Sequence, residues 1–465
     1  MAKPSSLPRP ARPPRWRLLL AAAVAVSLPQ PALAKRERPA KPAAVIPTVE
    51  LELRHQADAE LSGVYAARDY RPLWLTSGGT IAPAGSQLIE LIESASIDQL
   101  DPSALHSGEL KSAVAVLQQD SSPGARARAE LALSRAFVDY VRAIRRAPAT
   151  AMTYEHQSLR PAVPDRDDAL WAAAAAPSLF NYVEQMRWMH PLYAQLRRGA
   201  LAAEQSGEPD PAVLDNLARL RALPPMAKGR AILVDAASAR LWMYEDGRPV
   251  DSMKVVVGKP ETQTPLYAGY VRYAILNPYW NVPDNLVSDR IAANVLSRGP
   301  AYLRAARYEV LADWSSEPAR LDPAKVDWRQ VAAGANTLRV RQLPGADNAM
   351  GKIKFEFPNP LGIYLHDTPE KHLMLKEQRQ FSNGCVRLED AERLGRWLFQ
   401  GPLPSVGSEP EQRVDLPQIV PIYITYLTAH PVGGTIARGP DPYKRDVGAR
   451  LAVASPEGNS NAVAR

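Results

Sequence analysis

The hydrophobic pattern of this chain changes its period near Pro224-Pro225, and this change limits the folds open to it. Before that point, apolar residues recur three or four positions apart, as in amphipathic helices that pack on one another. One such series is Leu133, Phe137, Val141 and Ile144. After it, short apolar runs alternate with turns, which is typical of successive β-hairpins. We therefore predict an α-helical domain over residues 48–224 and a mainly β domain over residues 225–430.

The β pattern breaks between residues 284 and 341, where the sequence is helical and irregular and rich in Arg, Ala and Trp. Inside a β domain, such a break predicts an insertion that folds over a neighbouring site as a lid. A surface decoration is the alternative. Strand character then returns, a helix is expected over 390–400, and a final strand over 419–427. Residues 431–465 are polar and Ala-rich, which predicts a disordered tail.

Residues 1–34 have the plan of a secretory signal peptide. Basic residues precede an apolar run at 18–28, and Ala32-Leu33-Ala34 follows as a cleavage site. The apolar run is about half of the roughly 20 residues that a spanning helix needs, so a cleaved signal is favoured over a retained anchor. Residues 35–47 are rich in Pro and charge and predict a flexible linker.

If the chain is exported, its net charge and its single cysteine lead to different conclusions about function. Five basic residues and no acidic ones lie in residues 1–34, so removing the signal lowers the formal charge from +7 to +2. Nucleic-acid binding thereby loses its main support. The chain has one cysteine, so it forms no internal disulfide, and a leftover thiol in an exported protein indicates a reactive group.

That cysteine, Cys385, stands in a small turn that contains Gly384, between polar residues and an apolar run. His366 ends the run at 361–365, which predicts a strand. A His at a strand end can meet a Cys in a following turn. An imidazole can then take the proton from the thiol and produce the nucleophilic thiolate. The alternative is a buried structural Cys with an unrelated His.

This stretch resembles the signature of the L,D-transpeptidases with a YkuD-type catalytic domain. In that family a His is followed, after a spacer, by Ser/Thr-His-Gly-Cys and an apolar-Arg pair. The matching positions here are His366, Ser382, Asn383, Gly384, Cys385, Val386 and Arg387. Asn383 departs from the pattern, because the family usually has His there.

Further segments resemble the large periplasmic members of the family. The LHDTP sequence at 365–369 is one of them. An ordered series in the β domain also matches, namely Gly258-Lys259, Gln263-Thr264-Pro265 and residues 277–283. The segment ending at Trp74 and residues 190–196 resemble the all-α scaffold half. A separate peptidoglycan-binding module is not found in the sequence, because residues 207–211 form a predicted loop and a helix over 212–223 follows directly.

The resemblance implies a multidomain α+β protein, with an N-terminal all-α scaffold domain before a mainly β, YkuD-like sandwich that carries a helical lid. It implies a periplasmic enzyme that builds 3-3 cross-links in peptidoglycan, from a donor tetrapeptide and an acceptor stem, through a thioester on Cys385. Cell-wall synthesis proteins are expected partners, and carbapenems are expected inhibitors. No cofactor is expected. No metal site is expected either, because no H-E-x-x-H sequence occurs.

The same resemblance assigns roles to residues. His366 would act as the general base. Gly384, with the Cys385 backbone, would form the oxyanion hole. Ser382 and Asp367 would orient the imidazole or its loop. The expected substrate contacts are Arg387, Trp280 and Asn281.

The sequence does not name the acceptor of the acyl group. Resolution by water would make an L,D-carboxypeptidase, and resolution by a lipoprotein lysine would make an enzyme that anchors lipoproteins to peptidoglycan. A non-catalytic wall-binding scaffold is the alternative from another class of function.

Overall fold

The computed structural model describes residues 48–146, 148, 152–204, 210–226, 228–405 and 407–446. The predicted signal peptide, the predicted linker, most of the predicted loop at 207–211 and the last part of the predicted tail, 447–465, lie outside these residues. Within the described ranges, no helix is both long enough and apolar enough to cross a membrane.

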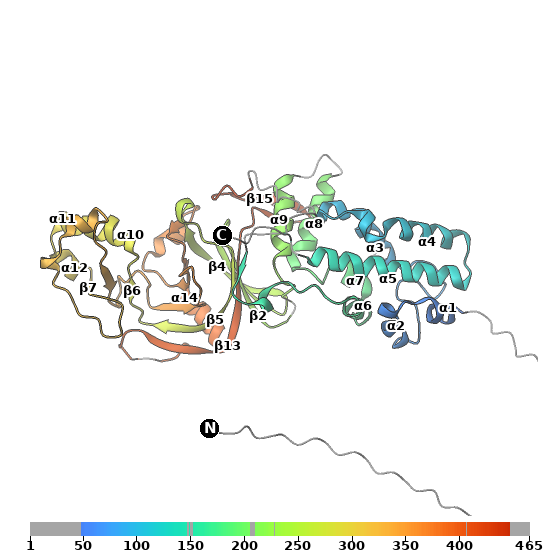
Figure 1. The fold of residues 1–465 in the computed structure, drawn as a ribbon, viewed down its shortest axis with the longest axis horizontal. Coiled ribbons are helices and arrows are strands. Elements are labelled where there is room, and N and C mark those ends of the chain that lie inside the picture. The colour runs from blue at the N-terminus through green and yellow to red at the C-terminus, as the bar shows by residue number, and fades with distance from the viewer. Residues whose placement is uncertain are drawn as a thin grey trace, which may run out of the picture. The chain divides into compact units, whose positions relative to one another are not determined.

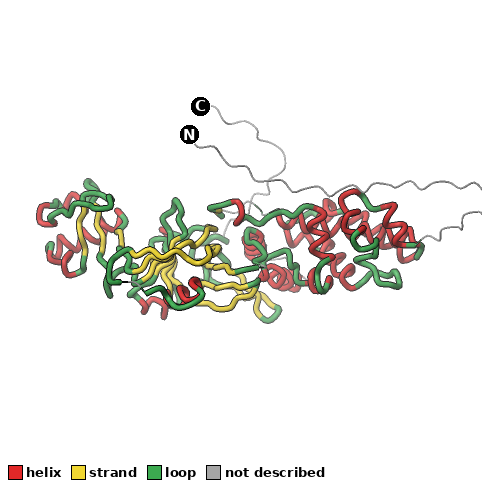
Figure 2. The backbone as a smooth tube through the Cα atoms, turned by 90° about the horizontal axis from the view of Figure 1, so that it is seen from below, coloured by secondary structure: helices red, strands yellow, loops and turns green. Residues whose placement is uncertain are grey.

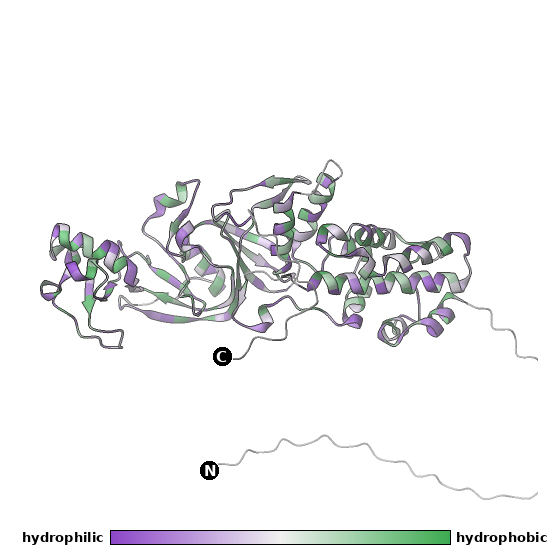
Figure 3. Cartoon of the chain, turned by 45° about the horizontal axis from the view of Figure 1, so that its top comes forward, coloured by the Kyte–Doolittle hydropathy of each residue, from purple (hydrophilic) through white to green (hydrophobic). Residues whose placement is uncertain are grey.

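The first half is helical and is built around one long helix, α5 (Pro123–Arg145) (Figure 1). Ser122 caps its start by accepting a hydrogen bond from the Ala125 N–H, and Pro123 occupies the first turn. The predicted apolar series on this helix is buried, which confirms the helical interpretation. The helices of this half carry both hydrophilic and hydrophobic residues (Figure 3). The other helices are α1 (Val49–Gln56), α2 (Ala59–Ala66), α3 (Pro83–Glu93), α4 (Ser107–Gln119), α6 (Arg166–Ala174), α7 (Leu179–Glu184), α8 (Pro191–Glu204) and α9 (Pro211–Arg221).

A buried carboxylate joins α5 to the segment that precedes α3. Glu130 is fully buried, and its carboxylate accepts hydrogen bonds from the Tyr65 hydroxyl at 2.7 Å and from the Trp74 N–H at 3.0 Å. The Leu73 N–H donates to the same carboxylate at 2.5 Å. Burial raises the pKa of Glu130, and these hydrogen bonds act in the opposite direction. The segment ending at Trp74 is therefore fixed by one side chain of α5.

The second half is a sheet that closes on itself. Its strands follow the order β5-β13-β2-β3-β4-β12-β10-β9, and β9 pairs again with β5. Figure 2 shows the strands in yellow, side by side. Their bounds are β2 (Arg230–Asp235), β3 (Arg240–Glu245), β4 (Arg248–Gly258), β5 (Tyr267–Leu276), β9 (Ile353–Glu356), β10 (Leu365–His366), β12 (Val386–Leu388) and β13 (Gln412–Thr425). Two short strands flank this ring, β1 (Thr153–Tyr154) on β5 and β11 (Gln380–Ser382) on β4.

The sequence pattern missed parts of this arrangement. The predicted hairpins β2–β3–β4 are antiparallel, but β13 pairs with β2 and β10 pairs with β12 in parallel. The final strand is longer than predicted, because β13 begins at Gln412. Strand β1 lies inside the region predicted to be helical. The helix expected over 390–400 is α14 (Ala391–Phe399), with Leu394 and Leu398 buried.

The predicted insertion has a hydrophobic core of its own, which extends from Trp280 to Met350. It contains a three-stranded sheet as well as helices, with strands β6 (Trp280–Asn281), β8 (Arg339–Gln342) and β7 (Tyr308–Leu311) in that order. Its helical segments are α10 (Asp284–Leu286), a π-helical turn (Val287–Ala292), α11 (Ala293–Arg298), α12 (Ala301–Ala305) and α13 (Trp328–Ala332). The insertion is thus a small α/β unit that extends beyond the predicted residues 284–341 at both ends.

The prediction of a disordered tail from residue 431 is wrong for residues 431–446. Strands β14 (Ala429–Val432) and β15 (Thr435–Arg438) form a hairpin. After it, Tyr443 is 6% exposed, and Asp446 forms an ion pair with Arg219 of α9 at 2.7 Å. Polar composition indicated disorder here, but these side chains have specific buried partners.

The Glu130 contacts generate a stability prediction. Replacing Glu130 by Ala removes the acceptor of the Leu73 and Trp74 N–H groups and one partner of the buried Tyr65 hydroxyl, so we expect the free energy of unfolding to fall by about 3 kcal/mol. Urea denaturation followed by circular dichroism measures this loss. Tyr65→Phe removes one of the same hydrogen bonds and should cost about 1 kcal/mol. An unchanged urea midpoint for Glu130→Ala would show that the carboxylate does not hold this segment.

Candidate active site

The turn that carries Cys385 is held by Ser382. The Ser382 hydroxyl donates to the Cys385 carbonyl oxygen at 2.6 Å and accepts from the Gly384 N–H at 3.1 Å. Gly384 has φ +117°, a backbone conformation that favours glycine, which explains why this residue type stands before the cysteine. Ser382 therefore orients the cysteine turn and not the imidazole, and the Gly384 N–H predicted to bind an oxyanion already has a partner in its own turn.

His366 is brought to this turn by strand pairing. Strand β10 lies between β9 and β12, with Leu365 opposite Val386 and His366 opposite Arg387. His366 and Cys385 thus line one cavity of about 650 Å³. The structure brings the two predicted catalytic residues together.

The hydrogen bond of the imidazole defines its protonation. The His366 Nδ1 atom lies 2.6 Å from the Asp367 carbonyl oxygen, and a carbonyl can only accept, so Nδ1 carries the proton. Nε2 is then left as the basic nitrogen. His366 is 2% exposed, and this burial, with the positive charge of Arg387 adding to it, lowers the pKa of His366 to about 3. The imidazole is neutral at neutral pH.

Cys385 is partly exposed, and its Sγ atom donates to the Gly362 carbonyl oxygen at 3.7 Å. Desolvation by the surrounding residues raises the pKa of the Cys385 thiol, while hydrogen bonds from Tyr364 oppose that shift. The resting residue is therefore a thiol, and it needs a base to become a nucleophile.

Tyr364 belongs to the site although it was not among the predicted residues. It hydrogen-bonds to Cys385, and its ring meets the His366 ring edge-on, with 5.6 Å between the ring centroids. The Lys354 ammonium lies 4.7 Å from the centre of the same ring. Period-two alternation could have found this residue, because residues two apart on a strand share a face.

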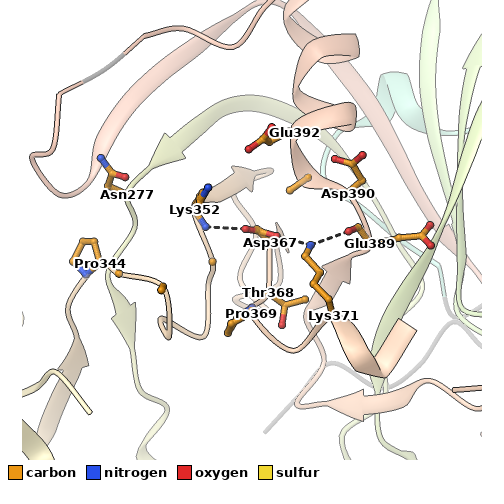
Figure 4. Close-up of a pocket in the computed structure, with 14 residues that line it drawn as sticks. Asn277, Pro344, Lys352, Asp367, Thr368, Pro369, Lys371, Glu389, Asp390 and Glu392 are labelled. Carbon is orange, nitrogen blue, oxygen red and sulfur yellow. Dashed lines mark hydrogen bonds and ion pairs between the residues drawn. The ribbon is translucent and has the colours of Figure 1, made fainter. Parts of the chain in front are cut away.

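Asp367 acts on the imidazole through its backbone, and its side chain holds that backbone in place. The carboxylate accepts from the Lys371 ammonium at 2.7 Å and from the Lys352 N–H at 2.9 Å (Figure 4). Gly351 has φ +62°, and a Cβ atom there would lie 2.3 Å from the carboxylate. These contacts border a second cavity, of about 620 Å³, whose lining includes Asp367 and Lys371 but neither His366 nor Cys385.

Of the three residues predicted to contact substrate, two line the cavity and one does not. Trp280 and Arg387 line the cavity that contains Cys385, as does Asn383, whereas Asn281 is absent from the lining and pairs with Arg341 in the β6–β8 ladder. Arg387 also donates to Glu370 at 2.5 Å, so it braces the site.

The insertion forms one wall of this cavity. Its contribution to the lining includes Arg290, Tyr302, Tyr308 and Met350. This placement is the one that a lid requires. Across the part of the chain that the structure describes, no three His, Cys, Asp or Glu side chains gather as ligands of a metal ion would.

Two family models match the chain. Residues 59–199 match the Scaffold domain, and residues 229–405 match the YkuD model, which describes the L,D-transpeptidase catalytic domain. The second match contains His366, Cys385 and the insertion.

Individual proteins resemble the chain to different degrees. A protein of Haemophilus influenzae, named as a candidate L,D-transpeptidase, is 26% identical over 400 residues, which cover 83% of this chain and 78% of that protein. An L,D-transpeptidase structure from Mycobacterium smegmatis is 13% identical, covers 42% of this chain and 58% of its own, and has a TM-score of 0.22. A cysteine-to-serine mutant of the Enterococcus faecium L,D-transpeptidase is 14% identical, covers 44% of this chain and 52% of its own, and has a TM-score of 0.19.

The chain thus spans just over half the length of these two solved structures, and their TM-scores support no comparison of geometry. The assignment rests on the family models, since the Scaffold model matches the helical half and the YkuD model matches the β half that follows it. The chain therefore contains an L,D-transpeptidase catalytic domain of the YkuD family at residues 229–405, behind a Scaffold domain at residues 59–199.

Proposed function

We propose that this protein cross-links peptidoglycan stem peptides through a thioester on Cys385. The observation that carries the proposal is that His366 and Cys385 face one cavity, with the His366 Nδ1 proton held by the Asp367 carbonyl and Nε2 left as the base. This arrangement fits acyl transfer by a cysteine that is activated only during the reaction.

In acylation, the Cys385 thiol gives its proton to His366 Nε2, and the sulfur attacks the carbonyl carbon of the third residue of the donor tetrapeptide. The tetrahedral intermediate carries a negative oxygen, which needs hydrogen-bond donors. When the intermediate collapses, the bond to the terminal D-alanine breaks, and its amine leaves with the proton held by His366. A thioester remains on Cys385.

In the second step, an amine on the third residue of another stem attacks the thioester. His366, now neutral, takes a proton from that amine and returns it to the sulfur as the C–S bond breaks, so the cysteine leaves as a thiol. The product joins two third residues, which is a 3-3 cross-link. Water as the acceptor would make a carboxypeptidase, and a lipoprotein lysine would make an anchoring enzyme.

The insertion supports a lid role in this scheme. Its side chains form a wall of the cavity, and Leu361 and Phe381 belong to the same lining. These two residues are exposed apolar side chains at the cavity, 50% and 39% exposed. The predicted signal peptide supports a periplasmic location, where peptidoglycan and cell-wall synthesis proteins are present.

A first prediction concerns the nucleophile. Cys385→Ala removes the sulfur with little change in volume, so the protein should fold while cross-linking is lost. Incubation with purified sacculi, followed by digestion and mass spectrometry of the muropeptides, identifies the products. The same analysis separates cross-linked, shortened and lipoprotein-bound stems, and so names the acceptor. Cross-links made by the Ala variant would refute the assignment of Cys385.

A second prediction concerns the base. His366→Ala should slow acylation by roughly 10²- to 10⁴-fold, the usual contribution of a general base. A base must be deprotonated to act, and the pKa of His366 is about 3. Lowering the pH from 7.5 to 5 should therefore not protonate His366, and the acylation rate of the wild-type protein should not fall through loss of this base. A half-maximal rate near the ordinary imidazole pKa of about 6.5 would contradict the buried neutral imidazole.

A third prediction concerns inhibition. We expect a carbapenem to form one adduct that maps to Cys385 and blocks cross-linking, because its strained carbonyl would react with the activated thiol beneath the lid. Intact-protein mass spectrometry before and after incubation measures the adduct. Detection of the same adduct on Cys385→Ala would place the reaction elsewhere in the chain.

A further inference from the structure

One buried hydroxyl links the loop after β4 to the turn that carries Cys385. The Thr264 hydroxyl accepts from the Gly258 N–H at 2.8 Å and lies 2.9 Å from the Gly384 carbonyl oxygen, to which it donates. Thr264 is 0% exposed, so water does not compete for these contacts. Because the hydroxyl accepts from Gly258, its single proton is directed at the Gly384 carbonyl.

The Gly384 carbonyl belongs to the same peptide unit as the Cys385 N–H. That peptide is trans, so its C=O and N–H bonds point in opposite directions. Fixing the carbonyl toward Thr264 therefore aims the Cys385 N–H away from Thr264. No acceptor among the residues that the structure describes takes this N–H, whereas the neighbouring Gly384 N–H is held by Ser382.

Residues 441–446, here called the C-terminal strap, hold the loop that contains Thr264. The Tyr443 hydroxyl donates to the Gly258 carbonyl oxygen at 2.7 Å and accepts from the Thr264 N–H at 3.3 Å. The Arg445 guanidinium donates twice to the Gln263 side-chain oxygen, at 2.8 and 3.1 Å. The strap thus contacts both ends of residues 258–264.

The strap is itself fixed by buried contacts. The Tyr443 ring stacks on Tyr426, with 5.2 Å between the centroids, and the Tyr443 N–H donates to the Tyr426 hydroxyl at 2.8 Å. At its other end, the Asp446 carboxylate pairs with Arg219 of α9 at 2.7 Å and accepts from the Thr428 hydroxyl. A chain of direct contacts therefore runs from α9 through the strap to the cysteine turn.

We propose that Thr264, held in place by Tyr443, is a positioning residue that aims the Cys385 N–H at the oxyanion formed during acyl transfer. The inference rests on the proposed function, because only attack on a carbonyl creates an oxyanion. It adds two residues, and neither of them is among those that line the cavity of Cys385. Loss of one correctly aimed donor typically slows such a reaction by about 10²- to 10³-fold.

The test uses two reagents that meet the same thiol. A carbapenem acylates by carbonyl addition and needs the oxyanion donor, whereas iodoacetamide alkylates the sulfur by displacement and does not. Thr264→Val keeps the shape of the side chain and removes the hydroxyl, while Thr264→Ser keeps the hydroxyl and serves as the matched control. Both rates are measured by intact-protein mass spectrometry.

For Thr264→Val, we expect acylation to slow by about 10²-fold while alkylation keeps the wild-type rate, and we expect Thr264→Ser to restore acylation. If acylation and alkylation slow equally, Thr264 only supports the turn. If neither reaction slows, Thr264 neither supports the turn nor aims the Cys385 N–H. Each of these two outcomes overturns the inference. Tyr443→Phe removes only the hydroxyl that holds the loop. It should show the same selective loss, smaller in size, and it decides the matter if Thr264→Val does not fold.

The outcome for the wild-type protein separates this inference from the proposed function. A wild-type thiol that is alkylated but never acylated would refute the proposed function, whatever the variants do. A wild-type protein that is acylated, together with a Thr264→Val variant acylated at the same rate, would refute only the role of Thr264 and the strap.

Discussion

The parallel pairing of β10 with β12 is the contact on which the catalytic half depends. Leu365 and Val386 are opposite each other and fully buried, so apolar packing sets the register of the two short strands. A slip of one residue would exchange the faces of a strand and turn its side chains the other way. Because His366 follows Leu365 and Cys385 precedes Val386, this register determines whether the imidazole and the sulfur face the same cavity.

Burial then determines the chemical state of the pair. An environment that lowers the pKa of His366 and raises the pKa of Cys385 favours a neutral imidazole beside a thiol over an imidazolium beside a thiolate. In the proposed mechanism, charge would develop only when a substrate carbonyl is present to receive the sulfur and a donor is present to stabilise the oxyanion. Under that mechanism the thiol would stay unreactive between turnovers. The backbone donor at Cys385 gains importance in it, because the Gly384 N–H is engaged by Ser382.

The sequence predicted what depends on local pattern. Helical periodicity located α5, and alternation located the first hairpins. A His at a strand end and a Cys in a following turn were expected to lie close together, and His366 and Cys385 do line one cavity. Contacts between distant segments could not be predicted in this way. The parallel pairs, the turn-holding role of Ser382 and the packing of Tyr443 against residues 258–264 depend on which elements meet in space. The strap was mistaken for disorder because composition does not show that Tyr443 and Asp446 have buried partners.

The central claim is that Cys385 becomes acylated by a stem peptide. The most direct measurement mixes the protein with a donor tetrapeptide without an acceptor, quenches the reaction in acid and records the intact mass, followed by peptide mapping. The account predicts a mass increase equal to the donor less its terminal D-alanine, located on Cys385 and released by hydroxylamine, as a thioester should be. A protein that cleaves or cross-links the donor without carrying this adduct, or that carries it on another residue, would contradict the account.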